Sequence, residues 1–233
     1  MESIRTIDEK FYGRIKSRKL TARQENLYQT LMPEISIKSF NEINNKDFRH
    51  VYLEIGFGSG EHITKMALNN PNDLFIGCEP FVNGVASLLV KIDENNIKNI
   101  MIYQADARAF IRTISSQSLS GVFLLFPDPW AKRKHIKRRF LQDKTIVEIY
   151  DKLVTGGFWR LASDHKEYKS WIVKLFNQEK FKNFFTINMF TKENRPDIEK
   201  WPETRYEKKA VDDILYAECV KIGGGCKVEQ EQD

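Results

Sequence analysis

Leu53-Glu54-Ile55-Gly56-Phe57-Gly58-Ser59-Gly60-Glu61 ends an apolar run and leads into a segment of helical length. Its glycines let the backbone turn tightly and approach a ligand closely, and the start of the following helix offers free N–H groups. The spacing is GxGxG with an acid, Glu54, two residues before Gly56, and it differs from the GxGxxG of nicotinamide and flavin binders. Because many loops need glycine for structural reasons alone, the meaning of this turn depends on its surroundings.

Apolar runs alternate with helix-like segments around this turn. Candidate strands lie at 51–55, 74–78, 100–104, 122–126 and 158–162, and candidate helices at about 60–69, 80–95, 106–114 and 138–154. Near-continuous apolar strands separated by helices predict a parallel sheet that is covered on both faces. Two further strands, 184–190 and 214–222, have no convincing helix between them and predict an antiparallel hairpin at the sheet edge. The predicted fold class is therefore α/β: a Rossmann-like, mostly parallel seven-stranded sheet with helices on both faces.

Length and composition limit the domain organisation, the possible metal sites and the compartment of this protein. With 233 residues, 41% of them hydrophobic, the chain is long enough for one domain with a substantial core. We expect a mobile or loosely docked basic N-terminal arm at 1–23, a single domain at 24–222 and a disordered polar tail at 223–233. The three cysteines and four histidines lack the spacing of disulfide frameworks or zinc ligands, so no metal site is predicted and a reducing compartment fits. No signal-like segment opens the chain, and no apolar stretch reaches the roughly 18 to 20 residues of a membrane span, so we expect a cytoplasmic protein without a membrane anchor.

Acidic residues follow the second and third candidate strands. Glu79 follows the second candidate strand and lies twenty-one residues after Gly58, a position at which an acid can bind two ribose hydroxyls. Asp106 follows the third strand, where its carboxylate can accept a hydrogen bond from the amino group of a base. These positions suit a cofactor that carries a ribose and an amino-bearing base.

The fourth strand ends in Phe126-Pro127-Asp128-Pro129-Trp130, and a basic run follows at once. Each proline fixes its own φ and pushes its predecessor towards extended geometry, so we expect Asp128 on a rigid turn. Six of the eight residues from 132 to 139 are Lys or Arg, a density of charge that suits a polyphosphate backbone. Together these features predict chemistry on nucleic acid. The structural alternatives are a proline-bounded loop with solvated charges, and a Trp130 side chain that fills the core.

The series LEIGFGSG, IGCEP and QADA at successive strand ends resembles the class I S-adenosylmethionine-dependent methyltransferases. The FPDPW turn with its basic run, and the later Thr204-Arg205-Tyr206-Glu207, resemble the bacterial single-chain tRNA (guanine-N7)-methyltransferases over about residues 50 to 222. The glycine loop is shared by a superfamily, whereas FPDPW followed by KRKHIKRR is far more restrictive. The resemblance implies that 24–222 is a single methyltransferase domain, with S-adenosylmethionine as cofactor, tRNA as partner, guanine-46 of the tRNA variable loop as target, and no obligatory protein partner.

The resemblance also implies a role for each residue that matches a family motif. The cofactor-binding residues fall on Glu54, Gly56, Gly58, Glu79, Asp106 and Asp128, and Asp128 is also the catalytic residue. The substrate-binding residues fall on Lys132, Asp164, Thr204, Arg205, Tyr206 and Glu207. The RNA contacts fall on Lys134, His135, Ile136, Lys137, Arg138 and Arg139. The common form of the late motif is TKFE, from which Arg205 and Tyr206 depart while they preserve charge and ring.

These residue types suit methyl transfer to guanine. The N7 atom has an in-plane lone pair and no proton, so its attack needs no general base, and a fixed carboxylate stabilises the charge that develops on the ring. A carboxylate also matches the two donors on the Watson–Crick edge of guanine, where adenine presents an acceptor. Asp128 and Asp164 are candidates for these two duties, and their division is open. Asp164 could instead cap a helix, and Glu207 could pair with Lys208 or Arg205 on a solvated loop.

Two other functions fit parts of the pattern. The same fold could methylate a protein or a small molecule, but neither substrate needs the positive charge that follows FPDPW. An RNA-binding protein without catalysis would be expected to have lost Gly56, Gly58, Glu79 or Asp128, and all four are present.

Overall fold

The computed structural model describes residues 13, 15–43, 47–195, 207–208, 210 and 213–223. Within them one sheet contains β1 (Val51–Ile55), β2 (Leu74–Cys78), β3 (Ile100–Tyr103), β4 (Leu119–Leu125), β5 (Leu153–Ser163), β6 (Phe185–Phe190) and β7 (Leu215–Lys221). The α-helices are α1 (Ala22–Thr30), α2 (Met32–Ile35), α3 (Glu61–Asn69), α4 (Val82–Asn95), α5 (Ala107–Ile111), α6 (Asp143–Lys152) and α7 (Lys166–Phe176). Short 3-10 helices lie at η2 (Phe40–Glu42), η4 (Arg133–Arg138) and η5 (Glu179–Phe181).

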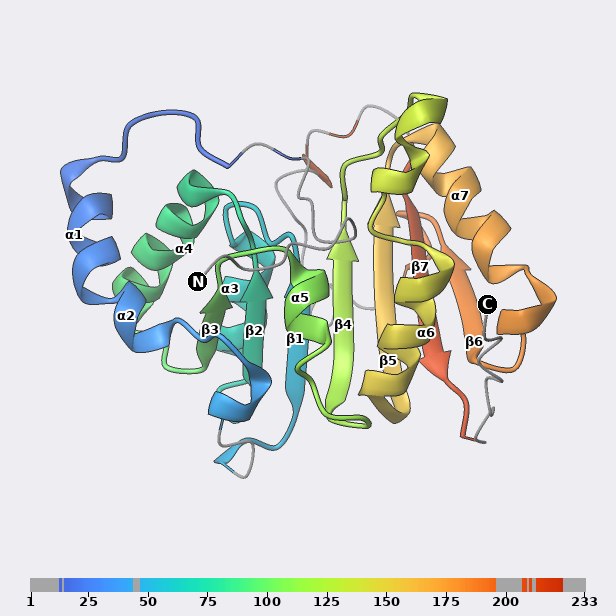
Figure 1. The fold of residues 1–233 in the computed structure, drawn as a ribbon, viewed down its shortest axis with the longest axis horizontal. Helices are drawn as coiled ribbons and strands as arrows, with labels where there is room; N and C mark the ends of the chain where they lie inside the picture. Colours follow the sequence, from blue (N-terminus) through green and yellow to red (C-terminus); the bar gives the residue numbers. More distant parts are fainter. Residues whose placement is uncertain are drawn as a thin grey trace, which may run out of the picture.

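The strand order β3-β2-β1-β4-β5-β7-β6 confirms the predicted fold class (Figure 1). β1 pairs in parallel with β2 and β4, β2 with β3, and β4 with β5, whereas β7 runs antiparallel to both β5 and β6. After β3 the chain returns to the other side of β1 and continues outward through β4 and β5. In open α/β sheets, ligands bind at such a switch point, outside the carboxyl ends of the strands.

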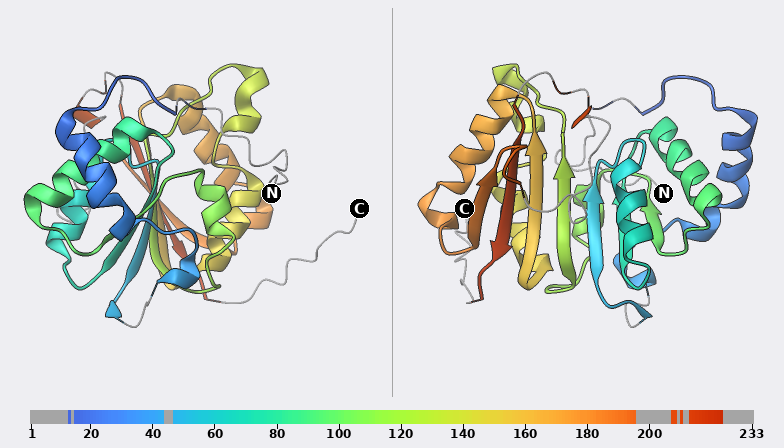
Figure 2. Two further views of the ribbon diagram at one scale, coloured as in Figure 1. Left: turned by 60° about the vertical axis from the view of Figure 1, so that its left-hand side comes forward. Right: turned by 180° about the vertical axis from the view of Figure 1, so that it is seen from behind.

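Two apolar layers cover the sheet, because successive side chains of a strand point to opposite faces. In β4, Val122 and Leu124 pack in the layer that includes α5, α6 and α7, whereas Phe123 and Leu125 pack in the layer that includes α1 to α4. All four side chains are buried. The oblique view and the view from behind in Figure 2 show helices on both faces, as predicted. None of the helices within the described residues is both long enough and apolar enough to cross a membrane.

The prediction of one helix over 138–154 is wrong at both ends. The basic run forms η4 and ends at Arg139, whose ψ of 138° is extended, so the helix restarts only at Asp143. There Gln142 begins a capping box, in which its backbone N–H donates to the Thr145 hydroxyl at 2.9 Å. At the other end, Leu153 already belongs to β5, where it pairs with Leu119 ahead of a register shift. The helix α1 was not predicted, although its capping box, Thr21 with Gln24, is visible in the sequence.

Candidate functional site

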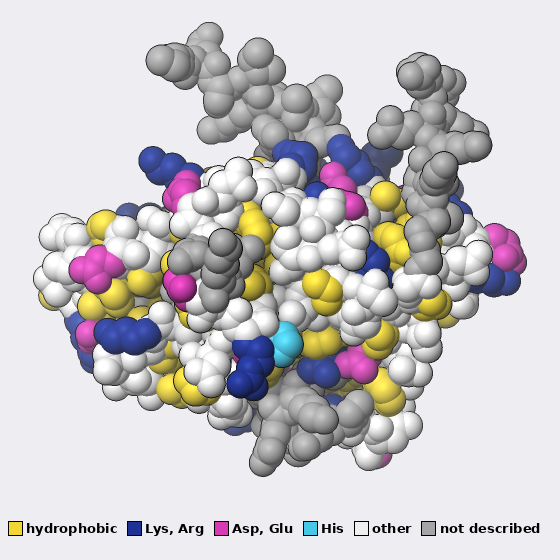
Figure 3. Space-filling model, turned by 90° about the horizontal axis from the view of Figure 1, so that it is seen from below, with side chains coloured by type: hydrophobic (Ala, Val, Ile, Leu, Met, Phe, Trp, Pro, Cys, Tyr) yellow, Lys and Arg dark blue, Asp and Glu magenta, His cyan; other side chains and the backbone are white. Residues whose placement is uncertain are grey.

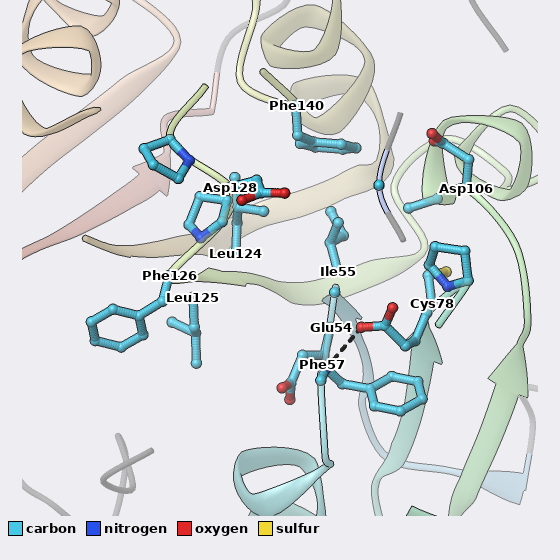
Figure 4. Close-up of a pocket in the computed structure, with 18 of the residues that line it drawn as sticks. Glu54, Ile55, Phe57, Cys78, Asp106, Leu124, Leu125, Phe126, Asp128 and Phe140 are labelled. Atoms are coloured by element: carbon cyan, nitrogen blue, oxygen red, sulfur yellow. Dashed lines mark hydrogen bonds between the residues drawn. The ribbon is translucent and has the colours of Figure 1, made fainter. Parts of the chain in front are cut away.

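A cavity of about 560 Å³ lies at the carboxyl ends of the parallel strands (Figure 4). Five acids at the carboxyl ends of β1 to β5 line this cavity: Glu54 is the second-last residue of β1, and Glu79, Asp106, Asp128 and Asp164 follow β2, β3, β4 and β5. In the view of Figure 4, Asp106 and Asp128 lie on opposite sides of the space, and Phe140 is above and between them. The fold therefore brings the predicted cofactor acids and the FPDPW turn into one site.

The glycine turn adopts the backbone geometry for which its sequence is suited. Gly56 and Gly58 have φ values of 69° and 56°, in the left-handed region that favours glycine. The turn also packs tightly on α4, because a Cβ atom at Gly84 would lie 2.4 Å from the carbonyl oxygen of Gly58. Gly84 therefore packs against the glycine turn. Its position inside a helical segment of the sequence did not predict this contact.

Glu79 is buried beside this turn, with 8% of its surface exposed. Its Oε2 accepts the backbone N–H of Gly58 at 2.9 Å, and its Oε1 accepts that of Phe81 at 2.9 Å. Burial raises the pKa of Glu79, and the two N–H bonds lower it, with burial the larger effect. The carboxylate is therefore held in one orientation at the cavity before any ligand arrives.

Glu54 has a partner that the sequence did not reveal. The Nδ1 atom of His62 lies 2.7 Å from Oε2 of Glu54, and both residues are buried. The His62 ring contacts the Phe123 ring edge-on, with centroids 4.7 Å apart, and its Nε2 atom is buried without a hydrogen-bond partner among the described residues. Because an ionised carboxylate only accepts hydrogen bonds, Nδ1 carries the proton in this contact.

Asp106 serves as the N-cap of α5 while it lines the cavity. Its Oδ1 accepts the backbone N–H of Arg108, and its Oδ2 pairs with the Arg108 guanidinium, both at 2.9 Å. The Nη2 atom of Arg108 also donates to the carbonyl oxygens of Arg138 and Arg139, each at 3.4 Å. The Arg108 guanidinium lies 5.4 Å from the centre of the Phe140 ring. Arg108 and Phe140, which line the cavity as well, were not predicted as site residues.

The FPDPW turn leaves Asp128 exposed at the cavity, with a strained residue at each end of the turn. Phe126 and Trp130 have φ values of 51° and 41°, uncommon for residues that carry a Cβ atom. Trp130 is half-buried and lines the cavity, so it does not fill the core. The Arg138 guanidinium lies 5.0 Å from the centre of its ring.

The basic run divides into exposed and buried side chains. Exposed cations are contributed by Lys132, Arg133, Lys134 and Lys137, whereas Ile136 and Arg138 are half-buried. Partial desolvation and then the charges of Arg138, Lys134 and Lys132 lower the pKa of His135. Arg139 is only 3% exposed. Figure 3 shows the opposite edge of the molecule, where acidic and basic side chains are both scattered.

The remaining predicted substrate residues have different positions. Asp164 lines the cavity but does not cap α7, because the N-cap is His165, with no side-chain cap bond. Glu207 is 3% exposed and pairs with Arg195 at 2.7 Å, and it accepts the Tyr216 hydroxyl at 2.6 Å. The alternative of a solvated loop pair is therefore wrong for Glu207. Thr204, Arg205 and Tyr206 lie outside the described residues.

Part of the N-terminal arm reaches the site. Gly13 lines the cavity, and the carbonyl of Ile15 accepts the backbone N–H of Val82 at 2.8 Å. The side chain of Asn83, at the start of α4, accepts the N–H of Ser17 at 3.0 Å and donates to the carbonyl of Arg18 at 2.9 Å. These bonds hold Ile15, Ser17 and Arg18 at the start of α4, and Gly13 lies at the cavity that the predicted cofactor acids line. Among the described residues, no group of three or more His, Cys, Asp or Glu side chains is placed to hold a metal ion.

Comparison with known proteins connects this site to one family. Residues 49–214 match the model of a protein family described as "Putative methyltransferase". The chain is 38% identical over 205 residues to a tRNA (guanine-N(7)-)-methyltransferase of Zymomonas mobilis, a match that covers 86% of this chain and 88% of that protein. It is 36% identical over 217 residues to the protein of the same name from a Caulobacter species, with 91% and 94% of the two chains covered.

Solved structures show the same fold at low sequence identity. An rRNA methylase from Streptococcus thermophilus matches with a TM-score of 0.53 and 10% identity, over 88% of this chain and all of that one. The structure of an antibiotic-related methyltransferase matches with a TM-score of 0.52 and 13% identity, over 88% and 97% of the two chains.

Proposed function

Because this chain belongs to the tRNA (guanine-N7-)-methyltransferase family, we propose that it transfers a methyl group from S-adenosylmethionine to N7 of guanine-46 in the variable loop of tRNA. The observation that carries the proposal is the single cavity that the glycine turn and the FPDPW turn line together. A donor held by one turn would face an acceptor held by the other.

The cofactor half of the cavity suits S-adenosylmethionine. The cavity volume of about 560 Å³ lies within the usual range for sites that bind small ligands. The proposed reaction requires the cavity to hold the cofactor and the target guanine base together. Glu79 would accept the ribose hydroxyls with a carboxylate that backbone N–H groups already orient, and Asp106 would accept the adenine amino group. When bound, the cofactor supplies the methyl group and its own leaving group.

The substrate half suits a guanine base. Asp128 and Asp164 project into the cavity from neighbouring strand ends, and they divide two tasks: one binds the donors of the Watson–Crick edge, and the other stabilises the charge that forms on the ring. No residue has to remove a proton from N7. The contribution of the protein is therefore orientation and a fixed negative charge.

The exposed cations of η4 and its flanks would bind the tRNA backbone. Lys132, Arg133, Lys134 and Lys137 point to solvent next to the turn that carries Asp128. Phosphate contacts of this kind position the RNA without reading its sequence. Thr204, Arg205 and Tyr206 remain proposed substrate contacts on the basis of their motif alone.

The test is to incubate the protein with tRNA transcripts and isotope-labelled cofactor and then to map the labelled nucleotide. We expect label on N7 of guanine-46, and none in a transcript that carries adenine at this position. Label at another guanine would overturn the target but not the chemistry. Binding of cofactor and tRNA without any transfer would support an RNA-binding protein, and transfer to protein in a lysate but not to tRNA would support the other alternative.

A further inference from the structure

The turn that presents Asp128 is strained at both of its ends. Phe126 has a φ of 51° and Trp130 a φ of 41°, and neither is a glycine. Residues in such sparsely populated regions persist only where the surrounding structure holds them. Phe126 is held by the sheet, because its backbone N–H donates to the carbonyl of Ala162 at 2.8 Å. The other end of the turn lies beyond the sheet and needs a different support.

Arg139 provides this support. Its Nε donates to the carbonyl oxygen of Pro129 at 2.8 Å. That carbonyl belongs to the peptide group that joins Pro129 to Trp130, so the bond fixes the peptide plane from which the unusual φ of Trp130 is measured. Asp128 immediately precedes Pro129, the residue whose carbonyl accepts this bond. A guanidinium ten residues along the chain thereby restrains the geometry of the carboxylate that faces the cavity.

Aromatic side chains of α7 enclose the Arg139 guanidinium. It lies 5.6 Å from the centre of the Tyr168 ring and 5.2 Å from that of Trp171. The Trp171 ring is itself fixed, because its Nε1 donates to the carbonyl of Leu141 at 2.8 Å. Cation–π contacts of this kind are strongest where water is excluded, and Arg139 is only 3% exposed. A phosphate would have to displace these rings to reach the charge.

We propose that Arg139 is a positioning residue for Asp128 and not an RNA contact. Its place at the end of a basic run suggested a phosphate contact, but the side chain turns inward, where the planar guanidinium binds a backbone carbonyl and two rings. The catalytic consequence rests on the proposed function, whereas the structural role can be tested without it.

The structural test compares conformational exchange at backbone amides, measured by NMR relaxation dispersion, in Arg139→Lys and the wild type without cofactor or tRNA. Lysine keeps the charge but loses the planar group that binds the carbonyl and lies over the two rings. We expect microsecond-to-millisecond exchange to appear at the amides of Asp128, Trp130 and Ala131, while the core strand β4 is unchanged. Lys137→Met, which removes an exposed cation of η4, is the matched control, and its turn should exchange at the wild-type rate. Unchanged exchange in Arg139→Lys would overturn the proposal.

The functional test separates turnover from RNA binding. In Arg139→Lys we expect kcat to fall at least tenfold at saturating tRNA. Because lysine keeps the charge, the slope of log affinity for tRNA against log salt is measured in Arg139→Met, where it should be unchanged. Lys137→Met should instead flatten that slope by about one, as expected for one lost phosphate contact. A flatter slope in Arg139→Met, with unchanged kcat in Arg139→Lys, would make Arg139 an RNA contact. If the wild type methylates no tRNA, the proposed function fails, and the exchange result still decides the structural role.

A measurement on the wild type covers the case in which the lysine variant does not fold. The Nε–H of Arg139 is buried and bonded, so its NMR signal should exchange slowly with water. We expect this signal to keep its position when tRNA is added. A large shift on addition of tRNA would show contact with phosphate and would overturn the proposal.

Discussion

The two halves of the site hold their acids in different ways. On the cofactor half, Glu54, Glu79 and Asp106 are each bonded to other protein groups: to His62, to two backbone N–H groups, and to Arg108. On the substrate half, Asp128 is exposed, and strained backbone at both ends of its turn sets its place. The cofactor acids are thus ordered by their own hydrogen bonds, whereas Asp128 is ordered by the turn that carries it. Changes to the first should alter cofactor binding, and changes to the second should alter turnover.

The largest effect is expected at Asp128. Asp128→Asn keeps the shape of the side chain and removes the charge that offsets the cationic product, so methyl transfer should fall by roughly a hundredfold or more. Cofactor affinity should stay within a few-fold of the wild type. Single-turnover rates measure the effect, and activity within twofold of the wild type would show that Asp128 is structural.

The next effect concerns the exposed cations. Replacement of Arg133, Lys134 and Lys137 together by glutamine should weaken tRNA binding and flatten the slope of log affinity against log salt by about two to three, if each side chain contacts one phosphate. Cofactor affinity is the internal control and should not change. A triple variant with the wild-type salt dependence would place the RNA elsewhere on the surface.

Glu79→Ala should break the cofactor half selectively. Loss of a carboxylate that two backbone N–H groups orient, and that we propose binds the ribose, should weaken cofactor binding by about 1–3 kcal/mol, as measured by calorimetry. The salt dependence of tRNA binding should remain that of the wild type. If the wild type itself shows no heat of cofactor binding, the methyltransferase function is wrong.

His62→Phe should have a smaller effect on the same half. The ring keeps its packing on Phe123, but Glu54 loses its bonded partner, so we expect cofactor affinity to fall by about fivefold, or roughly 1 kcal/mol. His62→Asn places an amide N–H near the position of Nδ1 and should restore most of that loss. Equal affinity in the phenylalanine variant and the wild type would show that Glu54 needs no partner. His50→Phe, at an exposed site, is the matched control.

The smallest expected effect is a pH dependence with opposite signs for stability and binding. Burial raises the pKa of Glu79 in the folded protein above its unfolded value, so the folded state holds a proton in the window between the two values. As pH falls through that window, the Glu79 contribution to stability without cofactor should rise, while cofactor affinity should fall because ribose hydroxyls need an ionised acceptor. Comparison of the wild type with Glu79→Gln isolates both changes, and parallel pH profiles in the two proteins would contradict this account.

The local sequence predicted most of the fold and the cofactor turn for physical reasons. Apolar runs of strand length separated by helical segments leave few arrangements other than a covered parallel sheet, and parallel strands bring their carboxyl ends to one edge. Five acids at those ends therefore had to meet, as they do in the cavity. Glycine at positions 56 and 58 likewise indicated backbone with positive φ, and both residues have it.

The sequence could not determine which of several similar polar side chains point into the protein and which point to solvent. Arg139 and Lys137 stand in the same basic run, yet only Arg139 is enclosed, because Tyr168 and Trp171 reach it from α7. His62 and Glu207 gained partners in the same way, from groups that the chain brings near only after folding. Sequence patterns record local periodicity and spacing, whereas the burial of a long polar side chain depends on what packs over it. The sequence by itself therefore determined the sheet, the glycine turn and the edge at which the acids gather, and only the tertiary structure decided which charges face the cavity or solvent and which are buried against the backbone.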